Sequence, residues 1–315
     1  MRRFICLICI MMTLILYGLV YIKSLKTQEM SAPKYTVGVV LKAMDSEHWL
    51  AVQSSMQKIA KSNNINLIVL YPKNEADYQA QNKMIIDLLK NDVDAIIVSP
   101  CNIYKAQEYL ALAKQKQIPI FTLDENIKDI QYIGSDNYRI GERAAEYLDK
   151  RLPKEAQVSI LSGSAVQEAH IKRVQGFVDY INKNTDLVIN NYIVDDINYR
   201  QATLQTEHLL KQYPDTQGLF VTNAVMTLGA IEAIDETDKQ ITIIGVDTQN
   251  DAIMAIKNKK IDAMISQDGY EIGALAMNIV LDYLINDRQP QKDNYIENNF
   301  ITIENADNYL LQEDF

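Results

Sequence analysis

The chain has 315 residues, of which 41 are Asp or Glu and 31 are Lys or Arg, and its net charge is −10. This acidic balance argues against a nucleic-acid partner, because binding to phosphates requires clustered Lys and Arg. Only Cys101 of the three cysteines lies beyond residue 30, so that part of the chain can form no intrachain disulfide. A body of roughly 285 residues is long for one hydrophobic core and comfortable for two.

The N-terminal segment is an apolar run over residues 4–22, interrupted only by Thr13 and Gly18. Its length approaches the ~20 residues that a helix needs to cross a bilayer. Arg2 and Arg3 precede it and predict a cytoplasmic N-terminus. The run is longer than the usual signal-peptide core of ~7–15 residues, and no small-residue cleavage site follows. We therefore expect residues 1–34 to be an uncleaved membrane anchor plus a short spacer, with a cleaved signal or a buried core helix as alternatives.

The chain from residue 35 alternates between short β-branched runs and longer stretches with helical spacing. Continuous apolar runs bounded by polar residues are typical of buried parallel strands. The predicted strands in the first half are 37–41, 65–70, 95–98, 118–123 and 130–133. The predicted helices between them are 46–63, 76–91 and 103–116.

The same alternation restarts after residue 133 and indicates a second unit. Its predicted strands are 158–161, 187–194, 218–221, 241–246 and 263–265. Helical stretches at 138–152, 165–183 and 271–286 separate or follow them. Repeated βα units predict parallel sheets with helices on both faces. No flexible linker marks the break near 134–137, so we expect two lobes joined by short hinges and a ligand held in the cleft between them.

Motifs for catalysis, metals or cofactors are missing from the sequence. It contains no G-x-G-x-x-G and no P-loop, and its three histidines, His48, His170 and His208, are far apart. A metal site or a histidine-activated nucleophile is therefore not expected, and neither is a cofactor. An enzyme on the same scaffold would need one of these groups, so we expect a non-catalytic protein.

Polar residues follow two predicted strands in the C-terminal third. Asp247 ends the run Ile-Gly-Val-Asp, and Gln267 ends Ile-Ser-Gln. Ligands of open α/β sheets bind at the carboxyl ends of strands. A carboxylate and a carboxamide without metal ligands nearby suit hydrogen bonding to a polyol. Trp49, the only tryptophan, follows the first strand and is either a stacking face for a sugar ring or a core residue of the first helix.

Several motifs in a shared order resemble the periplasmic sugar-binding proteins of the ribose, xylose and galactose type, whose fold also forms the ligand domain of lactose-repressor-like regulators. The resemblance covers residues 35 to about 303. The motifs are Val39-Val40 leading to Glu47-His48-Trp49, Ile118-Pro119-Ile120 leading to Leu123-Asp124, Gly134-Ser135-Asp136-Asn137, Arg173-x-x-Gly176-Phe177, Asn223 followed by Leu228-Gly229-Ala230, Gly245-x-Asp247, and Gln267.

This resemblance implies a type I periplasmic binding protein: two doubly wound α/β lobes with parallel sheets, joined by short hinges. We expect the N-terminal lobe to comprise 35–135 and 268–298, and the C-terminal lobe to comprise 136–267 and 299–315. The resemblance also implies the ligand-binding residues. They are His48 and Trp49 as ring-stacking aromatics, Asp124 as an acidic position, Arg173 as a donor from the second lobe, and Asn223, Asp247 and Gln267 as hydroxyl-binding positions.

Three departures from the ribose-binding pattern bear on specificity. Glu125 stands where ribose binders usually carry arginine, and Lys42 stands where a small polar residue is common. We expect these two to lie in the site and to pair across the cleft. Asn198 and its neighbour Ile197 fall where ribose binders have a further aromatic wall. The Glu-x-Trp pattern is closer to xylose binders, so a xylose-like aldopentose or aldohexose is favoured.

The expected function is that of an extracytoplasmic monosaccharide receptor that closes on its sugar. Because an uncleaved anchor without a lipid-attachment cysteine suits a tethered receptor, we expect a membrane sensor histidine kinase as partner. The alternative is the permease of an ABC sugar importer. A transcription repressor is excluded, because the N-terminal segment is apolar and no helix-turn-helix precedes residue 35.

Overall fold

The computed structural model describes residues 12, 17, 32–44, 46–194 and 198–310. Apart from residues 12 and 17, the expected membrane anchor, residues 4–22, lies outside the described residues, as do Ile197 and the last residues of the C-terminal lobe, 311–315. Among the described helices, none combines the length and the apolar character needed to cross a membrane.

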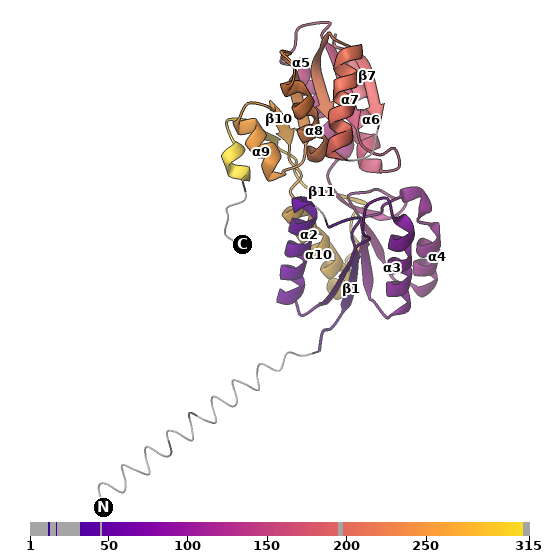
Figure 1. Cartoon of the computed structure of the whole chain (residues 1–315). Coiled ribbons are helices and arrows are strands. Elements are labelled where there is room, and N and C mark those ends of the chain that lie inside the picture. Colours follow the sequence, from indigo (N-terminus) through magenta and orange to yellow (C-terminus); the bar gives the residue numbers. More distant parts are fainter. Residues whose placement is uncertain (1–11, 13–16, 18–31, 45, 195–197, 311–315) are drawn as a thin grey trace, which may run out of the picture.

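Two six-stranded sheets lie one above the other, each covered by helices (Figure 1). The first sheet has the order β11-β5-β4-β3-β1-β2, and all its neighbouring strands are parallel. Its strands are β1 (Thr36–Val40), β2 (Asn66–Leu70), β3 (Ala95–Val98), β4 (Ile120–Leu123), β5 (Gln131–Gly134) and β11 (Asp293–Tyr295). We call this sheet and its helices lobe 1.

The second sheet has the order β12-β10-β9-β8-β6-β7 and is parallel except for the pairing of β10 with β12. Its strands are β6 (Gln157–Ser162), β7 (Val188–Val194), β8 (Thr216–Val221), β9 (Thr242–Val246), β10 (Ala263–Ile265) and β12 (Phe300–Ile301). We call this sheet and its helices lobe 2. The α/β class and the parallel sheets agree with the sequence-based expectation.

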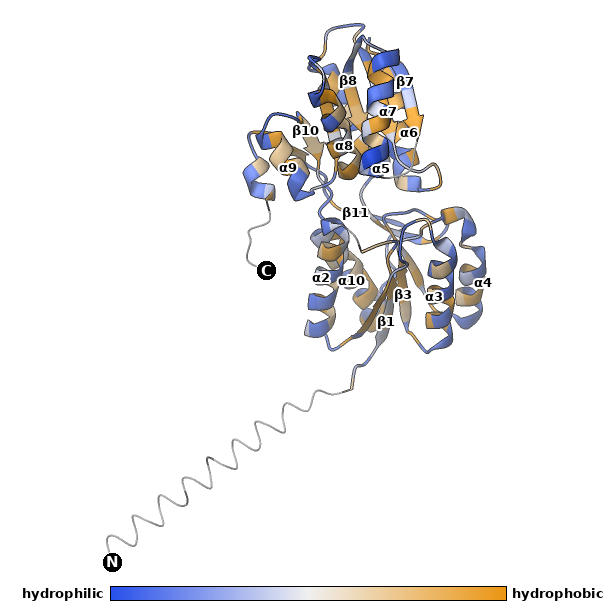
Figure 2. Ribbon diagram, viewed as in Figure 1, coloured by the Kyte–Doolittle hydropathy of each residue, from blue (hydrophilic) through white to orange (hydrophobic). Residues whose placement is uncertain are grey.

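The helices of lobe 1 cover both faces of its sheet, and the strands are its most apolar part (Figure 2). They are α2 (Glu47–Ser62), α3 (Tyr78–Lys90), a 3₁₀ turn η1 (Ile103–Lys105), α4 (Gln107–Lys116) and α10 (Gly269–Asn286). Side chains of α2 and α10 pack on one face, and those of α3 and α4 pack on the other. The single helix predicted over 103–116 is interrupted, because the side chain of Asn102 accepts a bond from Tyr104 N and caps a separate turn.

Lobe 2 repeats this arrangement with five helices and a terminal 3₁₀ turn among the described residues. They are α5 (Asn137–Asp149), α6 (Glu168–Asn184), α7 (Tyr199–Gln212), α8 (Ala224–Asp235), α9 (Asn250–Lys257) and η2 (Ala306–Tyr309). Helices α5 and α6 pack on one face of the sheet, and α7, α8 and α9 pack on the other. We keep the lobe boundaries given above as a proposal.

Three described segments connect the lobes: 135–136 between β5 and α5, 266–268 between β10 and α10, and 296–299 between β11 and β12. One buried side chain from each segment meets the others. Ser135 Oγ accepts hydrogen bonds from Gln267 Nε2 and from Asn298 Nδ2, both at 2.9 Å. Asn298 Nδ2 also donates to Ser266 O at 2.7 Å. These bonds join the three connections to one another. We call Ser135, Gln267 and Asn298 the hinge cluster.

Candidate functional site

A cavity of about 870 Å³ lies between the lobes, where the carboxyl ends of the strands of both sheets meet. This is where an open α/β sheet binds its ligands. Nine of the ten predicted site residues line it. They are Lys42, His48, Trp49, Asp124, Arg173, Asn198, Asn223, Asp247 and Gln267.

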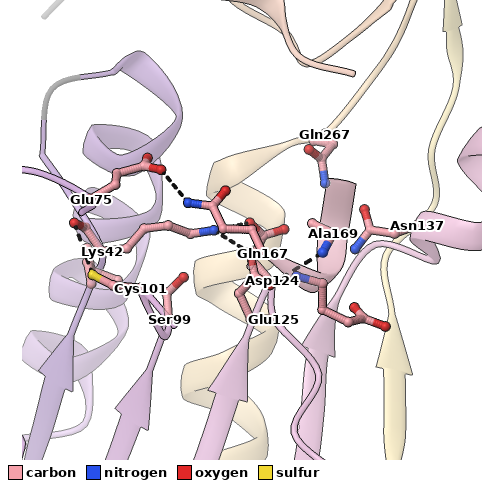
Figure 3. Close-up of polar contacts among 12 residues, drawn as sticks. Lys42, Glu75, Ser99, Cys101, Asp124, Glu125, Asn137, Gln167, Ala169 and Gln267 are labelled. Carbon is pink, nitrogen blue, oxygen red and sulfur yellow. Dashed lines mark hydrogen bonds and ion pairs between the residues drawn. The ribbon is translucent and has the colours of Figure 1, made fainter. Parts of the chain in front are cut away.

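The floor on the lobe 1 side is a buried cluster of charges that follows β1 and β4 (Figure 3). Lys42 Nζ lies 2.6 Å from Glu125 Oε1 and 3.5 Å from Asp124 Oδ2. Burial alone would lower the pKa of Lys42, but the carboxylates of Glu125 and Asp124 outweigh burial and raise that pKa. Lys42 is therefore a charged ammonium at the bottom of the cavity.

The structure corrects two expectations about this pair. Lys42 and Glu125 do pair, but within lobe 1 and not across the cleft, because β1 and β4 belong to the same sheet and are separated only by β3. Glu125 is fully buried and does not line the cavity. Its second oxygen, Oε2, accepts hydrogen bonds from the backbone N–H groups of Glu168 and Ala169 in lobe 2. Both oxygens of Glu125 are thus occupied by the protein.

Asp124 follows β4 and lines the cavity. Its backbone has a φ of 63°, in the left-handed region, and its N–H donates to Ile133 O at 2.9 Å. Burial alone would raise the pKa of Asp124, but the positive charges of Lys42 and then Arg173 outweigh burial and lower that pKa. Its Oδ1 is buried without a hydrogen-bond partner among the described residues. An ionised oxygen left unpaired is costly, so this atom suits a ligand hydroxyl.

Trp49 is both a core residue and a wall of the cavity. Its side chain is buried in the hydrophobic core that α2 forms with α10, and it also lines the cavity. The ring of His48 meets it edge-on with centroids 4.8 Å apart, and Lys42 Nζ lies 5.7 Å from its centroid. The Nδ1 atom of His48 is buried with no partner in the described structure. This corner combines an aromatic surface with an unpaired polar atom.

Arg173 is the central donor of lobe 2 and is almost completely buried. Its Nε donates to Asn137 Oδ1 at 3.0 Å, its Nη1 to Thr222 O at 2.6 Å, and its Nη2 to Gln267 Oε1 at 2.5 Å. These bonds fix the plane of the guanidinium, which has N–H donors beyond the three used here. Because Gln267 also donates to Ser135, Arg173 is linked directly to the hinge cluster.

The position of Arg173 depends on a close approach of α5 and α6. A Cβ atom on Gly141 would lie 1.9 Å from Arg173 O, and one on Gly176 would lie 2.0 Å from Tyr138 O. Both contacts are impossible for real atoms, so each helix needs glycine where it faces the other. The glycine in the motif Arg173-x-x-Gly176 thus lets α6 approach α5, which also brings Arg173 within reach of Asn137.

Asn223 and Asp247 follow neighbouring strands, β8 and β9, and each also supports the start of α8. Asn223 Oδ1 accepts from Met226 N at 2.8 Å, and Asp247 Oδ2 accepts from Ala224 N at 3.1 Å. Asp247 has a φ of 93°. These bonds orient both side chains and use Asn223 Oδ1 and Asp247 Oδ2. Asn223 Nδ2 and Asp247 Oδ1 are the atoms that could bond a ligand. Asn198 caps α7 through Gln201 N at 2.8 Å and lies exposed at the rim of the cavity.

Several residues of the site were not predicted from the sequence. His170 is buried, lines the cavity and bonds Thr222 Oγ1 through Nδ1 at 2.7 Å. Burial, followed by Arg173 and Lys42, lowers the pKa of His170, so its ring is neutral. Its spacing of three residues from Arg173 on one helix places both on the same face, and that signal was available in the sequence. Glu75 and Gln167 also line the cavity, and no sequence pattern singled them out.

Within the described residues, no group of three or more His, Cys, Asp or Glu side chains is arranged to hold a metal ion. Cys101 lies at the cavity edge, where burial is the main cause that raises its pKa to about 12. Its thiol therefore stays protonated and is a poor nucleophile. The arrangement can donate and accept many hydrogen bonds, but the described residues offer no activated nucleophile.

The comparisons with known proteins agree with this geometry. The family described as "Periplasmic binding protein domain" matches residues 37–288. The ribose import binding protein of Bacillus subtilis is 28% identical over 254 residues, which cover 80% of this chain and 82% of that protein. A solute-binding protein from Actinobacillus succinogenes, solved with bound D-allose, has a TM-score of 0.81 at 24% identity and covers 88% of this chain and 100% of that one. A carbohydrate-binding protein from Agrobacterium radiobacter, solved with D-arabinose, has a TM-score of 0.82 at 20% identity and covers 89% of this chain and 100% of its own.

Proposed function

Because the chain belongs to the periplasmic binding protein family, we propose that its interlobe cavity binds one neutral monosaccharide and closes over it. The matched family consists of solute-binding proteins and not of enzymes, which agrees with the expectation of a non-catalytic protein. The two-lobed α/β fold with parallel sheets is that of the type I sugar-binding members.

The observation that carries the proposal is the convergence of oriented polar groups from both lobes on one cavity. Asp124, whose buried Oδ1 has no partner among the described residues, lines it from lobe 1, while Arg173, Asn223 and Asp247 line it from lobe 2. A sugar has a rim of hydroxyls and apolar C–H faces, and Trp49 provides an aromatic surface for such a face. A ligand that bonds both lobes at once favours the closed form over the open one.

The charges of the cavity favour a neutral ligand. Four carboxylates among the lining residues, Glu47, Glu75, Asp124 and Asp247, stand against the cations Lys42 and Arg173. A sugar acid or a sugar phosphate would bring further negative charge into this acidic cavity, and its burial would be opposed. A neutral aldose or polyol meets no such penalty.

The identity of the sugar is proposed at the level of an aldose. The relatives named above carry ribose, D-allose and D-arabinose in their descriptions. The preference for a xylose-like sugar therefore rests only on the motif Glu47-His48-Trp49. We propose that the ligand is an aldopentose or a close aldohexose, and D-xylose remains one member of that set.

For the partner we favour the permease of an ABC sugar importer. The support is the relationship to proteins described as import binding proteins, so this reading now precedes the sensor kinase favoured by sequence alone. The receptor for a sensor kinase stays as the second candidate, because the apolar run at residues 4–22 carries no cysteine where a lipid would attach.

N-terminal sequencing of native protein distinguishes the two partners. A retained N-terminus in the membrane fraction supports the tethered receptor, and a mature chain starting between residues 24 and 36 supports the importer.

A thermal-shift screen of the full chain in mild detergent tests the ligand class. The panel contains D-ribose, D-allose, D-arabinose, D-xylose and myo-inositol, with D-glucuronate and D-ribose 5-phosphate as anionic controls. A sugar present at 100 times its Kd stabilises the folded protein by ~2.7 kcal/mol. We expect at least one neutral member to raise the melting temperature and both anions to leave it unchanged.

A further inference from the structure

Two helices of lobe 2 begin without a capping side chain of their own. The first N–H groups of a helix lack partners within it, and Asp, Asn, Ser or Thr at the N-cap usually provides one. Helices α5, α7 and α8 follow this rule, because their N-cap residues accept a first-turn N–H. Helices α6 and α9 instead have Gln167 and Gln249 as N-cap residues, and neither side chain makes a capping bond.

The missing caps come from glutamates of lobe 1. Glu125 Oε2 accepts from Glu168 N at 2.5 Å and from Ala169 N at 3.4 Å, at the start of α6. Glu47 Oε2 accepts from Asn250 N at 2.8 Å, at the start of α9. A carboxylate at a helix N-terminus is favoured both by these bonds and by the helix dipole.

A third glutamate strengthens the same contact. Glu75 Oε2 of lobe 1 accepts from Nε2 of Gln167, the N-cap residue of α6, at 2.8 Å (Figure 3). Each of the three glutamates bonds from lobe 1 to lobe 2 across the cleft, so these contacts exist only while the lobes are closed. When the lobes separate, the starts of α6 and α9 lose these caps.

The capped helices also hold the ligand-facing side chains. Helix α6 carries His170 and Arg173, and α9 begins just after Asp247, all three of which line the cavity. We propose that Glu47 and Glu125 are positioning residues that cap α9 and α6 from the opposite lobe and thereby favour the closed form even before ligand binds. The proposal rests on the proposed function only in the sense that closure assembles the sugar site.

The two caps depend on one motion, and this gives the proposal a distinctive consequence. If both form through the same closure, loss of either glutamate opens the cleft and exposes both helix starts. A purely local bond would expose only the helix that it touches. Amide hydrogen exchange of the ligand-free protein, followed by mass spectrometry, measures the exchange rates at both helix starts in one experiment.

The experiment uses full-length protein in mild detergent with the variants Glu47→Gln and Glu125→Gln. Glu232→Gln is the matched control, because it removes the same charge from a contact within lobe 2, where Glu232 accepts from Thr203. We expect each test variant to exchange roughly two- to fivefold faster at Glu168 and Ala169 and also at Asn250, because a neutral amide interacts more weakly than a carboxylate with the N-terminus of a helix. The sheets and the Glu232→Gln control should exchange like the wild type.

The proposal is overturned if each variant affects only its own helix start, or if neither changes exchange at all. The Glu47→Gln variant keeps the proposal testable if Glu125→Gln fails to fold. Glu47 has no salt bridge in the described structure, whereas Glu125 neutralises Lys42. Protection of cavity-lining peptides by an excess of D-ribose is scored separately in the wild type. Its absence would count against ribose as ligand and would leave the result for the helix starts unaffected.

Discussion

Ser135 and Gln267 lie on different connections between the lobes, yet Gln267 Nε2 donates to Ser135 Oγ at 2.9 Å. The same Gln267 accepts from Arg173 through Oε1. A cavity-lining arginine is therefore one side chain away from the hinge. If the lobes close as proposed, a ligand that fixes Arg173 also restrains the cluster that joins their connections, and this gives a physical route from occupancy to closure.

Removing the hydroxyl of Ser135 should weaken the hinge. In Ser135→Ala, the amide groups of Gln267 and Asn298 lose a buried acceptor. A buried donor left unpaired costs about 1–3 kcal/mol, so we expect the free energy of unfolding in urea to fall by that amount. Ser62→Ala, at an exposed helix position, is the control and should change stability by less than about 0.5 kcal/mol. Equal stability of the two variants would contradict the role of the hinge cluster.

The fluorescence of Trp49 should report ligand binding. It is the only tryptophan, and it lines the cavity beside His48 and Lys42. A sugar ring placed on the indole replaces water there, so a binding sugar should shift or quench the emission. The measurement is a fluorescence titration with the best sugar of the thermal screen, with D-glucuronate at equal concentration as control. An unchanged spectrum at saturation would mean that Trp49 serves only the core.

Sugar affinity should decrease as pH rises toward neutrality because of Glu168. Burial, and then the nearby Glu125, raise the pKa of Glu168 to about 7, with Asp124 adding to this and Lys172 opposing it. Separation of the lobes takes Glu168 away from Glu125 and Asp124 of lobe 1, and its pKa returns toward the usual ~4.3. Closure therefore takes up a proton between these two values, and the closed form loses this advantage as pH rises through them.

Isothermal titration calorimetry at pH 5 and pH 8 measures this effect. We expect roughly tenfold weaker binding at the higher pH, a figure reduced for the partial exposure of the group. Glu168→Gln keeps the shape of the side chain without a titrating proton, and it should bind almost equally at both values. A pH dependence that persists in this variant would assign the effect to another group.

Much of the fold follows from the sequence because buried parallel strands are continuous apolar runs. The runs at 95–98 and 263–265 coincide with β3 and β10. The strands β11 and β12 were not predicted, since they are only three and two residues long and β11 is polar. Strands of this kind exist through pairing with the neighbouring strand, and that information is not local.

Asp247 and Gln267 were predicted because each follows a strand, Asp124 and Arg173 were predicted from the family resemblance, and contacts that depend on tertiary placement were missed. Asp124 and Asp247 each follow a strand and line the cavity. The pairing of Lys42 with Glu125 was expected from charge alone, but only the strand order shows that both belong to lobe 1. Likewise, Glu125 caps α6 at Glu168, which is 43 residues away in the sequence, and no local pattern predicts this contact.

Calorimetric titration of the wild type and of Asp247→Asn with the best sugar of the screen tests the central claim most directly. Asparagine tolerates the positive φ of this position and keeps the shape of the side chain, so the fold should be retained. Loss of the charged acceptor costs about 1.5–3 kcal/mol, which corresponds to roughly tenfold or weaker binding. We predict one sugar per wild-type chain and at least about tenfold weaker binding by the variant. Equal affinity of the two proteins, with unchanged melting temperatures in the absence of sugar, would contradict the assignment of this cavity as the sugar site.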